Sequence, residues 1–365
     1  MKKRILFVAT FPPPIHGSAV MSQYIKESKL INDTFDCDYI NLSTSRGIDE
    51  IGIFNPIKIW RLFIALFVMT WKLSIKHYDL CYLAITCHGI GFLKDAPFVF
   101  LCKLFRRKVV IHQHNKGMSK DLERWPYSWL LPLTYKNVKV ILLSQRLYQD
   151  IDKVVPKENV YICPNGIPEV DCEYKYMERR NEIPHLLFLS NLMESKGVIV
   201  LLDALKILKG KGLSFICDFV GGETKEVDLV RFEHDVVRHG LSQIAIYKGR
   251  KVGAEKEDSL LKADLFIFPT FYHNECFPLV LLEAMQYGLP IVTTDEGGIP
   301  DIVKDGENGL ICEKNNPDSL ANCIEMLLKD NTLREEYGRK GRDLFEKKYS
   351  LYTFECRMTE ILGSC

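Results

Sequence analysis

Short apolar segments alternate with stretches of helical periodicity along the whole chain. In the first half, six runs rich in β-branched and aromatic residues predict strands at 5–10, 38–42, 80–85, 108–114, 138–144 and 160–164. Helical patterns, such as those of 19–28 and 56–76, lie between most of these runs. Near-continuous apolar strands separated by helices are typical of a parallel sheet that is covered by helices on both faces.

The same alternation restarts after a polar stretch. Strands are predicted at 185–189, 215–220, 245–247, 265–269, 290–294 and 310–312, with helices between them at 198–208, 227–239, 278–287 and 317–328. We therefore expect an α/β protein with two Rossmann-like doubly wound domains that face a central cleft. The predicted first domain is 1–168 plus a C-terminal helix at about 346–365, the linker is 169–183, and the second domain is 184–345.

The distribution of charge along the chain is uneven. The net charge of the 365 residues is +1, but residues 1–168 carry 23 lysines and arginines against 13 acidic residues, and the remainder carries 25 against 34. A basic first half fits a surface that meets anionic lipid, an anionic acceptor or nucleic acid. A scattered, solvated surface is an equally good interpretation of the same charges.

An uncharged apolar segment at 62–71 has two interpretations. At ten residues it is too short to span a bilayer, which takes about 20 residues. It is either a core helix packed on the sheet or a helix that dips into a membrane surface, with Trp60 and Trp71 at the level of the headgroups. In the second case the protein would bind peripherally to the inner face of the cell membrane.

The cysteine pattern predicts a reducing compartment. The chain has 12 cysteines, no C-x-x-C pair, and most of the thiols in apolar runs, as expected for buried reduced thiols. The apolar run that follows the basic N-terminus stops at the prolines of 12–14, before it could form a signal sequence, and fits a first strand better. We expect a cytoplasmic protein without structural zinc.

The most informative segment is 274–285, which follows a predicted buried strand and opens a helix. Pro278 suits the first turn of that helix, where a missing N–H costs nothing. The free N–H groups of a helix start attract a diphosphate. Glu275 lies just before the helix and Glu283 about two turns into it, so each carboxylate could hold a sugar diol. An N-cap region with an unrelated surface glutamate is the alternative.

This segment and those after it resemble the signature of glycosyltransferase family 4, a family of retaining enzymes with the GT-B fold. The resemblance rests on Glu275 and Glu283, on Ala284-Met285, and on the glycine-rich stretches 288–292 and 297–303. It implies that Glu275 contacts the donor sugar and Glu283 the nucleotide ribose. The neighbouring residues Cys276, Phe277 and Leu279 would then line the same donor site.

A second segment, 187–197, resembles the strand and basic loop with which the family neutralises the donor diphosphate. Lys196 matches the family's lysine, whereas Asn191 stands where the family has an arginine. The resemblance therefore implies one cation fewer beside the leaving group. Arg250 or Lys251, in the loop after strand 245–247, could compensate from the next loop. Asn191 as a simple turn residue and Arg250 as a solvated one are the alternatives.

Two further candidates lie in the first half. Gly17 follows the first strand, where a glycine lets backbone approach a phosphate or sugar closely. His112 and His114 alternate along their strand and so face one side of it. The family resemblance implies a histidine at this strand end near the reacting sugar, and His114 fits best. A structural histidine is the alternative, and no third ligand is evident for a metal.

Together with these observations, the resemblance implies a metal-independent glycosyltransferase with Lys196, Glu275 and His114 as catalytic residues and no cofactor. The donor would be a UDP- or GDP-sugar, and the acceptor a glycan, lipid-linked, as in surface polysaccharide assembly. A nucleotide-sugar epimerase, a phosphorylase and a non-catalytic nucleotide-sugar binder stay open as alternatives. The Asp36-x-Asp38 sequence lies at the wrong end of a strand for a metal site, and no motif for nucleic-acid binding is present.

Overall fold

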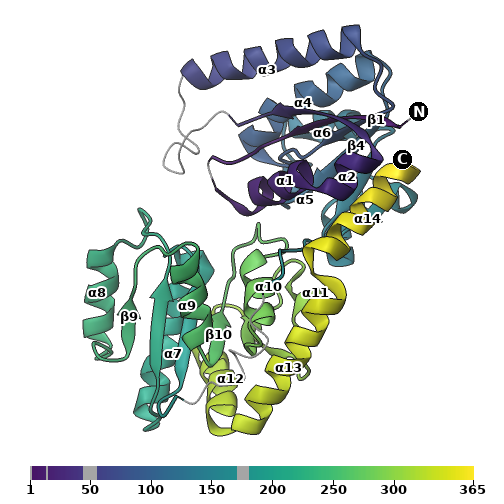
Figure 1. Ribbon diagram of the computed structural model, residues 1–365. Helices are drawn as coiled ribbons and strands as arrows, with labels where there is room; N and C mark the ends of the chain where they lie inside the picture. Colours follow the sequence, from purple (N-terminus) through teal and green to yellow (C-terminus); the bar gives the residue numbers. More distant parts are fainter. Residues whose placement is uncertain (1, 14, 44–55, 171–180) are drawn as a thin grey trace. The chain divides into compact units, whose positions relative to one another are not determined.

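A computed structural model describes residues 2–13, 15–43, 56–170 and 181–365 (Figure 1). The chain divides into two compact units. The first contains Met1–Gly166 and Leu351–Cys365, and the second contains Ile167–Ser350. Most of the predicted linker, 169–183, lies outside the described residues.

The first unit is built on a parallel sheet of six strands in the order β2-β1-β3-β4-β5-β6. The strands are β1 Arg4–Ala9, β2 Asp36–Asn41, β3 Leu80–Leu83, β4 Val109–Gln113, β5 Lys139–Leu142 and β6 Val160–Ile162. The strand order reverses between β1 and β3, and loops at the carboxyl ends of such strands are where ligands bind in open sheets.

Helices cover both faces of this sheet. They are α1 Gly17–Glu27, α2 Lys29–Thr34, α3 Pro56–Ile75, α4 Gly89–Leu104, α5 Met118–Asp121, α6 Tyr127–Tyr135 and α14 Leu351–Ser364. Right-handed crossovers send α1 and α2 to one face and α3, α4 and α6 to the other, as the ribbon shows (Figure 1). The predicted last helix returns to this unit as α14, which packs against α2.

The second unit has its own parallel six-stranded sheet, ordered β12-β11-β10-β7-β8-β9. Its strands are β7 His185–Leu189, β8 Ile216–Val220, β9 Ala245–Tyr247, β10 Leu265–Phe268, β11 Ile291–Thr294 and β12 Gly309–Cys312. Here the order reverses between β7 and β10, so the loops that follow these two central strands leave the sheet side by side.

In the described part of the second unit, seven helices surround this sheet. They are α7 Val198–Gly210, α8 Leu229–Arg238, α9 Ala254–Lys262, α10 Leu279–Gln286, α11 Ile299–Ile302, α12 Pro317–Lys329 and α13 Asn331–Lys348. Buried aliphatic and aromatic residues of β7, β8, α7 and α12 form its core. The prediction that Pro278 begins the helix is off by one residue, because Pro278 has extended backbone and α10 starts at Leu279.

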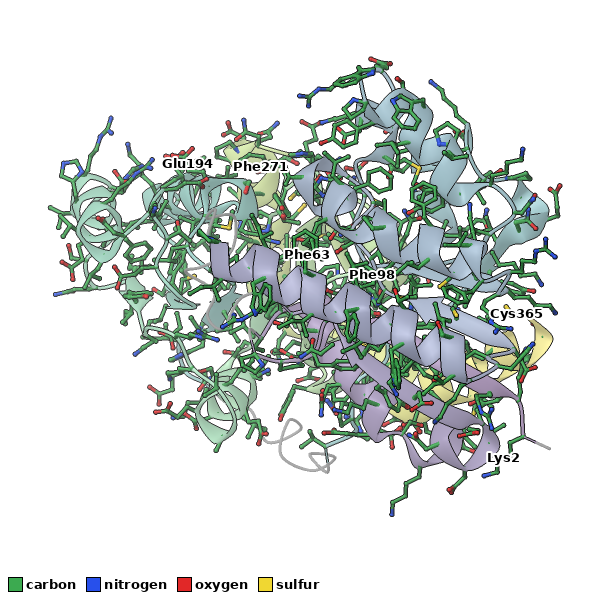
Figure 2. The ribbon with its side chains drawn as sticks, turned by 90° about the horizontal axis from the view of Figure 1, so that it is seen from above. Lys2, Phe63, Phe98, Glu194, Phe271 and Cys365 are labelled. Atoms are coloured by element: carbon green, nitrogen blue, oxygen red, sulfur yellow. The ribbon has the colours of Figure 1, made fainter. Side chains whose placement is uncertain are left out.

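Helix α3 corrects one interpretation of the sequence. Of its 20 residues only Met69 and Leu73 are buried, so it is not a core helix, and its outer face is apolar and exposed. Seen from above, α3 crosses the front of the first unit with Phe63 along it (Figure 2). Within the described residues, no helix is both long and apolar enough to cross a bilayer.

Candidate active site

Lys196 and Glu275 meet at the carboxyl edge of the second sheet. Lys196 ends a short 3₁₀ turn, Glu194–Lys196, in the loop after β7, and Glu275 lies in the loop between β10 and α10. The ammonium of Lys196 forms an ion pair with Oε2 of Glu275 and lies 4.7 Å from the ring centroid of Tyr272. Both charged side chains are largely buried, so the structure brings together the two residues that the sequence placed on separate motifs.

Close backbone packing holds the lysine loop in this position. The N–H of Phe271 donates to the carbonyl of Ser195 over 2.8 Å. Gly197 follows Lys196 with a left-handed φ of 85°, and a Cβ there would lie 2.3 Å from the carbonyl oxygen of Pro269. Only glycine fits this junction, which ties the loop after β7 to the end of β10.

The loop after β11 packs closely against the backbone of Glu275. A Cβ on Gly297 would lie 2.1 Å from the carbonyl oxygen of Glu275, and the N–H of Gly298 donates to Cys276 over 2.7 Å. Cys276 and Phe277 are buried, and Phe277 packs edge-on against Tyr349. These two residues therefore anchor the loop, and Leu279 then opens α10.

Glu283 lies on α10 and has a partner that sequence reasoning missed. Its Oε1 accepts a bond of 2.8 Å from the ammonium of Lys256 on α9, while its Oε2 is buried without a hydrogen-bond partner. The helices α9 and α10 flank β10 in the chain and share one face of the sheet, because both crossovers run in the same direction. That strand order was the signal that could have identified Lys256.

Asn191 and Arg250 lie at the same edge on the loops after β7 and β9, with the loop after β8 between them, so Arg250 is not on the neighbouring loop as predicted. Oδ1 of Asn191 accepts from the N–H of Gly222 over 3.2 Å, and the N–H of Gly221 donates to the carbonyl of Gly249 over 3.0 Å. Hydrogen bonds thus join the loop after β7 to the loop after β8, and the loop after β8 to the loop after β9. Arg250 follows Gly249 with an exposed side chain, so a cation is available two loops away from Asn191.

In the first unit, Gly17 begins α1 and His16 caps it, with Nδ1 accepting from the N–H of Ala19. A Cβ on Gly17 would meet no atom within 4 Å, so protein packing does not require glycine at this position. The predicted approach of a ligand to Gly17 stays a prediction. His114 follows β4 by one residue, and its ring lies 4.1 Å from that of His112, on the same side of the strand as the alternation predicts.

These two histidines are neutral. Burial lowers the pKa of His114 to about 3, with His16 adding to the effect, and burial lowers that of His112 far below its usual range. Nδ1 of His112 bonds with the hydroxyl of Tyr82 at 2.7 Å, while Nε2 of each ring is buried without a hydrogen-bond partner. A neutral buried imidazole can accept or donate a hydrogen bond without charge, as a positioning group near a sugar would need.

The histidines predict an acid-sensitive first unit. An unfolded histidine has a pKa near 6.5, so from about pH 6.5 down to about pH 3 the unfolded chain binds a proton that folded His114 does not. The free energy of unfolding therefore falls with pH in this window, by up to about 1.4 kcal/mol per pH unit and group. When the pH is lowered from 7.5 to about 5, the melting temperature of His114→Gln should decrease less than that of the parent. His234→Gln, on exposed α8, should behave like the parent, and equal losses in all three would contradict this account.

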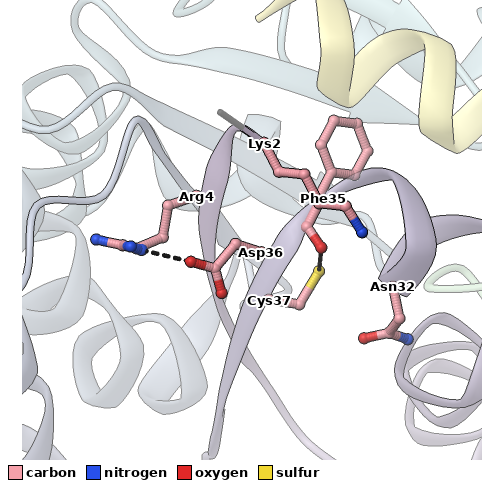
Figure 3. Close-up of a pocket in the computed structure, with 6 residues that line it drawn as sticks. All are labelled: Lys2, Arg4, Asn32, Phe35, Asp36 and Cys37. Atoms are coloured by element: carbon pink, nitrogen blue, oxygen red, sulfur yellow. Dashed lines mark hydrogen bonds and ion pairs between the residues drawn. The ribbon is translucent and has the colours of Figure 1, made fainter.

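One open depression lies away from the candidate residues. It has a volume of about 480 Å³ and is lined by Lys2, Arg4, Asn32, Phe35, Asp36 and Cys37, at the amino ends of β1 and β2 (Figure 3). The carboxyl ends of the strands, where the candidate residues lie, are at the opposite edge of the sheet. We therefore assign no substrate to this depression.

The Asp-x-Asp sequence is used by structural ion pairs. Asp36 pairs with Arg4 at 2.7 Å, and Asp38 pairs with Lys72 at 2.8 Å. Burial alone would raise the pKa of Asp38, but its hydrogen bonds from Lys72, Tyr78 and Lys76 outweigh it and lower the pKa. Among the residues that the structure describes, no three histidine, cysteine or carboxylate side chains lie together as a metal site would require.

Comparison with known proteins agrees with this architecture. The whole chain superposes on HepE of Anabaena, solved in complex with UDP and glucose, with a TM-score of 0.73, 18% identity and complete coverage of both chains. The fold is therefore that of the GT-B glycosyltransferases. Residues 177–344, which make up most of the second unit, match the family model of glycosyl transferases group 1.

Curated relatives match parts of this chain. The chain is 31% identical over 218 residues to the uncharacterized glycosyltransferase MJ1178 of Methanocaldococcus jannaschii, covering 60% of this chain and 57% of the relative. It is 30% identical over 187 residues to the capsular polysaccharide biosynthesis glycosyltransferase CapM of Staphylococcus aureus, covering 49% and 45%. The matches thus span about half the length of these relatives. Both relatives are named as glycosyltransferases.

Proposed function

We propose that this protein transfers a sugar from a UDP- or GDP-sugar to a lipid-linked glycan, with retention of anomeric configuration and without a metal ion. The observation that carries the proposal is the ion pair of Lys196 and Glu275 at the switch point of the second sheet. A cation and a carboxylate at this position can bind the two halves of a nucleotide sugar, its diphosphate and its sugar hydroxyls. In the proposed cell context, the enzyme works at the inner face of the membrane in surface polysaccharide assembly.

Donor binding would exchange the partners of this ion pair. A diphosphate carries more negative charge than Glu275 and would draw the ammonium of Lys196 to itself. Glu275 would then be free to accept hydrogen bonds from hydroxyl groups of the transferred sugar. Glu283, eight residues along on α10, has one oxygen without a hydrogen-bond partner that could accept from a ribose hydroxyl. Arg250 supplies the second cation that Asn191 lacks.

The chemistry follows from a leaving group that is itself a base. The acceptor hydroxyl oxygen forms a bond to the anomeric carbon on the face from which the phosphate oxygen departs. The bond between that carbon and the phosphate oxygen breaks, and the phosphate oxygen takes the hydroxyl proton. Lys196 stabilises the charge that develops on the diphosphate, which is the kind of interaction that accelerates such a step. His114, on the first unit, would orient the sugar as a neutral hydrogen-bonding group.

The relatives support the donor class and the setting. HepE was solved with UDP and glucose, and CapM is named for capsular polysaccharide biosynthesis.

A thermal-shift screen against UDP- and GDP-sugars, with and without EDTA, tests the donor site. A ligand at 100 times its dissociation constant adds about 2.7 kcal/mol of stability. We expect one base to raise the melting temperature, EDTA to leave the rise intact, and Glu283→Ala to reduce it. Glu336→Ala is the matched control, because it removes a solvent-exposed glutamate of α13 that is paired with Lys340, and it should keep the full shift. No shift with any nucleotide sugar in well-folded protein would contradict the assignment.

The products then distinguish transfer from the alternatives. Consumption of the donor that requires a glycan acceptor and yields an α-linked product from an α-linked donor indicates retaining transfer. Interconversion of the nucleotide sugar without acceptor would indicate an epimerase. Binding without turnover on any acceptor would indicate a nucleotide-sugar binder.

A further inference from the structure

We propose that the outer face of α3 lies flat in the interface of an anionic lipid bilayer and positions the first unit on the membrane. This inference deepens the proposed function, on which it rests for the lipid-linked acceptor. The exposed fractions of four aromatic side chains on α3 carry it: Trp60 is 67% exposed, Phe63 60%, Phe67 72% and Trp71 59%. Large aromatic residues usually bury most of their surface, so such a row marks a surface that contacts something else.

The exposed residues form one stripe along the helix. At about 100° per residue, Trp60, Phe67 and Trp71 lie within about 40° of one another around the axis. Ile64, 46% exposed, lies between Trp60 and Phe67, and Ile75, 57% exposed, extends the stripe toward the end of the helix. A stripe that runs the full length of a helix about 30 Å long can meet a flat surface along its whole extent.

Charge favours a membrane over a protein partner. The segment 56–76 contains four cations and no acidic residue. Two of the cations, Lys72 and Lys76, pair with Asp38, and the other two, Lys58 and Arg61, flank Trp60. An apolar helix face with tryptophans and phenylalanines, bordered by lysine and arginine, is the pattern of helices that lie in the interface plane. A protein interface usually concentrates its apolar contacts in a compact centre with a polar rim, and α3 has no such arrangement.

Neighbouring helices on the same face of the sheet extend the apolar surface. Helix α4 contacts both α3 and α6. Leu104 of α4 is 75% exposed, and Trp129 of α6 and Trp125 just before it are also exposed. All four tryptophans of the chain are therefore exposed and belong to the first unit. The tryptophans are therefore an intrinsic fluorescent probe, because their entire emission comes from α3, from α6 and from the residue just before α6.

The test is tryptophan fluorescence of the full chain with phosphatidylcholine vesicles, with and without about one third phosphatidylglycerol. We expect a blue shift with the anionic vesicles, quenching by brominated acyl chains, and a decrease in binding at high salt. Trp125→Phe/Trp129→Phe, which leaves the α3 pair, should keep the shift. If only Trp60→Phe/Trp71→Phe keeps it, α6 and not α3 enters the bilayer, and the proposal is overturned.

Two matched variants measure the contribution of the stripe. Phe63→Ser/Phe67→Ser should weaken vesicle binding about tenfold or more. Val230→Ser/Val237→Ser, at exposed apolar positions of α8 in the second unit, should leave it unchanged. Equal binding by both variants would overturn the proposal. A second result would also overturn it: the parent chain does not bind vesicles and is a dimer in solution, whereas Phe63→Ser/Phe67→Ser is a monomer. In that case a second copy of the chain would cover the stripe. The thermal shift with nucleotide sugar is independent of these readouts, so failure of the membrane contact and failure of the donor site are distinguishable.

Discussion

Replacing Lys196 with alanine is expected to lower the rate constant for transfer about a hundredfold to a thousandfold. The ammonium lies against Glu275 and the ring of Tyr272, in a largely buried position. There it can stabilise negative charge on the departing diphosphate more strongly than a solvated lysine could. Because this charge grows as the bond to the sugar breaks, kcat should fall more than KM rises.

Initial rates at saturating donor measure this effect. Lys211→Ala is the matched control, since Lys211 also pairs with a glutamate, Glu325, elsewhere on the second unit. It should retain the parental rate. The melting temperature of each variant separates lost chemistry from lost folding, because removing Lys196 leaves Glu275 without its ion-pair partner. A rise in KM with kcat unchanged would show that Lys196 only binds the donor.

Gly197→Ala is expected to destabilise the second unit by about 2–4 kcal/mol and to abolish the thermal shift with donor. The new Cβ would require a left-handed backbone and would lie 2.3 Å from the carbonyl oxygen of Pro269. Relief of this clash would separate the loop after β7 from the end of β10. Lys196 would then move away from Glu275, so that the donor site is lost even in molecules that stay folded.

Denaturant unfolding measures the stability change, and Gly210→Ala is its control. Gly210 ends the same helix, α7, and a Cβ there would meet nothing within 4 Å. This control should be neutral or stabilising by about 0.5–1 kcal/mol, because alanine suits a helix better than glycine. Similar destabilisation by both alanines would contradict the importance of the Gly197–Pro269 contact.

The strands were the most predictable part of this protein. The strand at 185–189 was predicted with the bounds that β7 has, and that at 245–247 with the bounds of β9. Strands buried on both faces need continuous apolar runs, and polar loops bound these runs sharply. The loop after β10 was predictable for a similar reason, since Glu275 and Pro278 stand between a buried strand and a helix.

Other features could not be predicted because they depend on which elements become neighbours. An apolar helix such as α3 has the same periodicity whether its outer face is covered or exposed, so the choice between core and surface stayed open. The bond between Lys256 and Glu283 joins two helices through the strand order of the sheet. The role of Gly197 depends on a contact with Pro269, 72 positions along the chain, for which no local signal exists.

The position of α14 has a consequence for biosynthesis. A ribosome synthesises the sheet of the first unit before the second unit, but Phe354, Met358 and Leu362, which are buried in the first unit, emerge only after the whole second unit. The side chain of Lys3 likewise donates to the carbonyl of Leu362 over 2.8 Å. The second unit, continuous from Ile167 to Ser350, can therefore finish folding during translation while the first still exposes apolar surface. Nascent chains of this protein would need chaperone protection of the first unit until α14 has emerged.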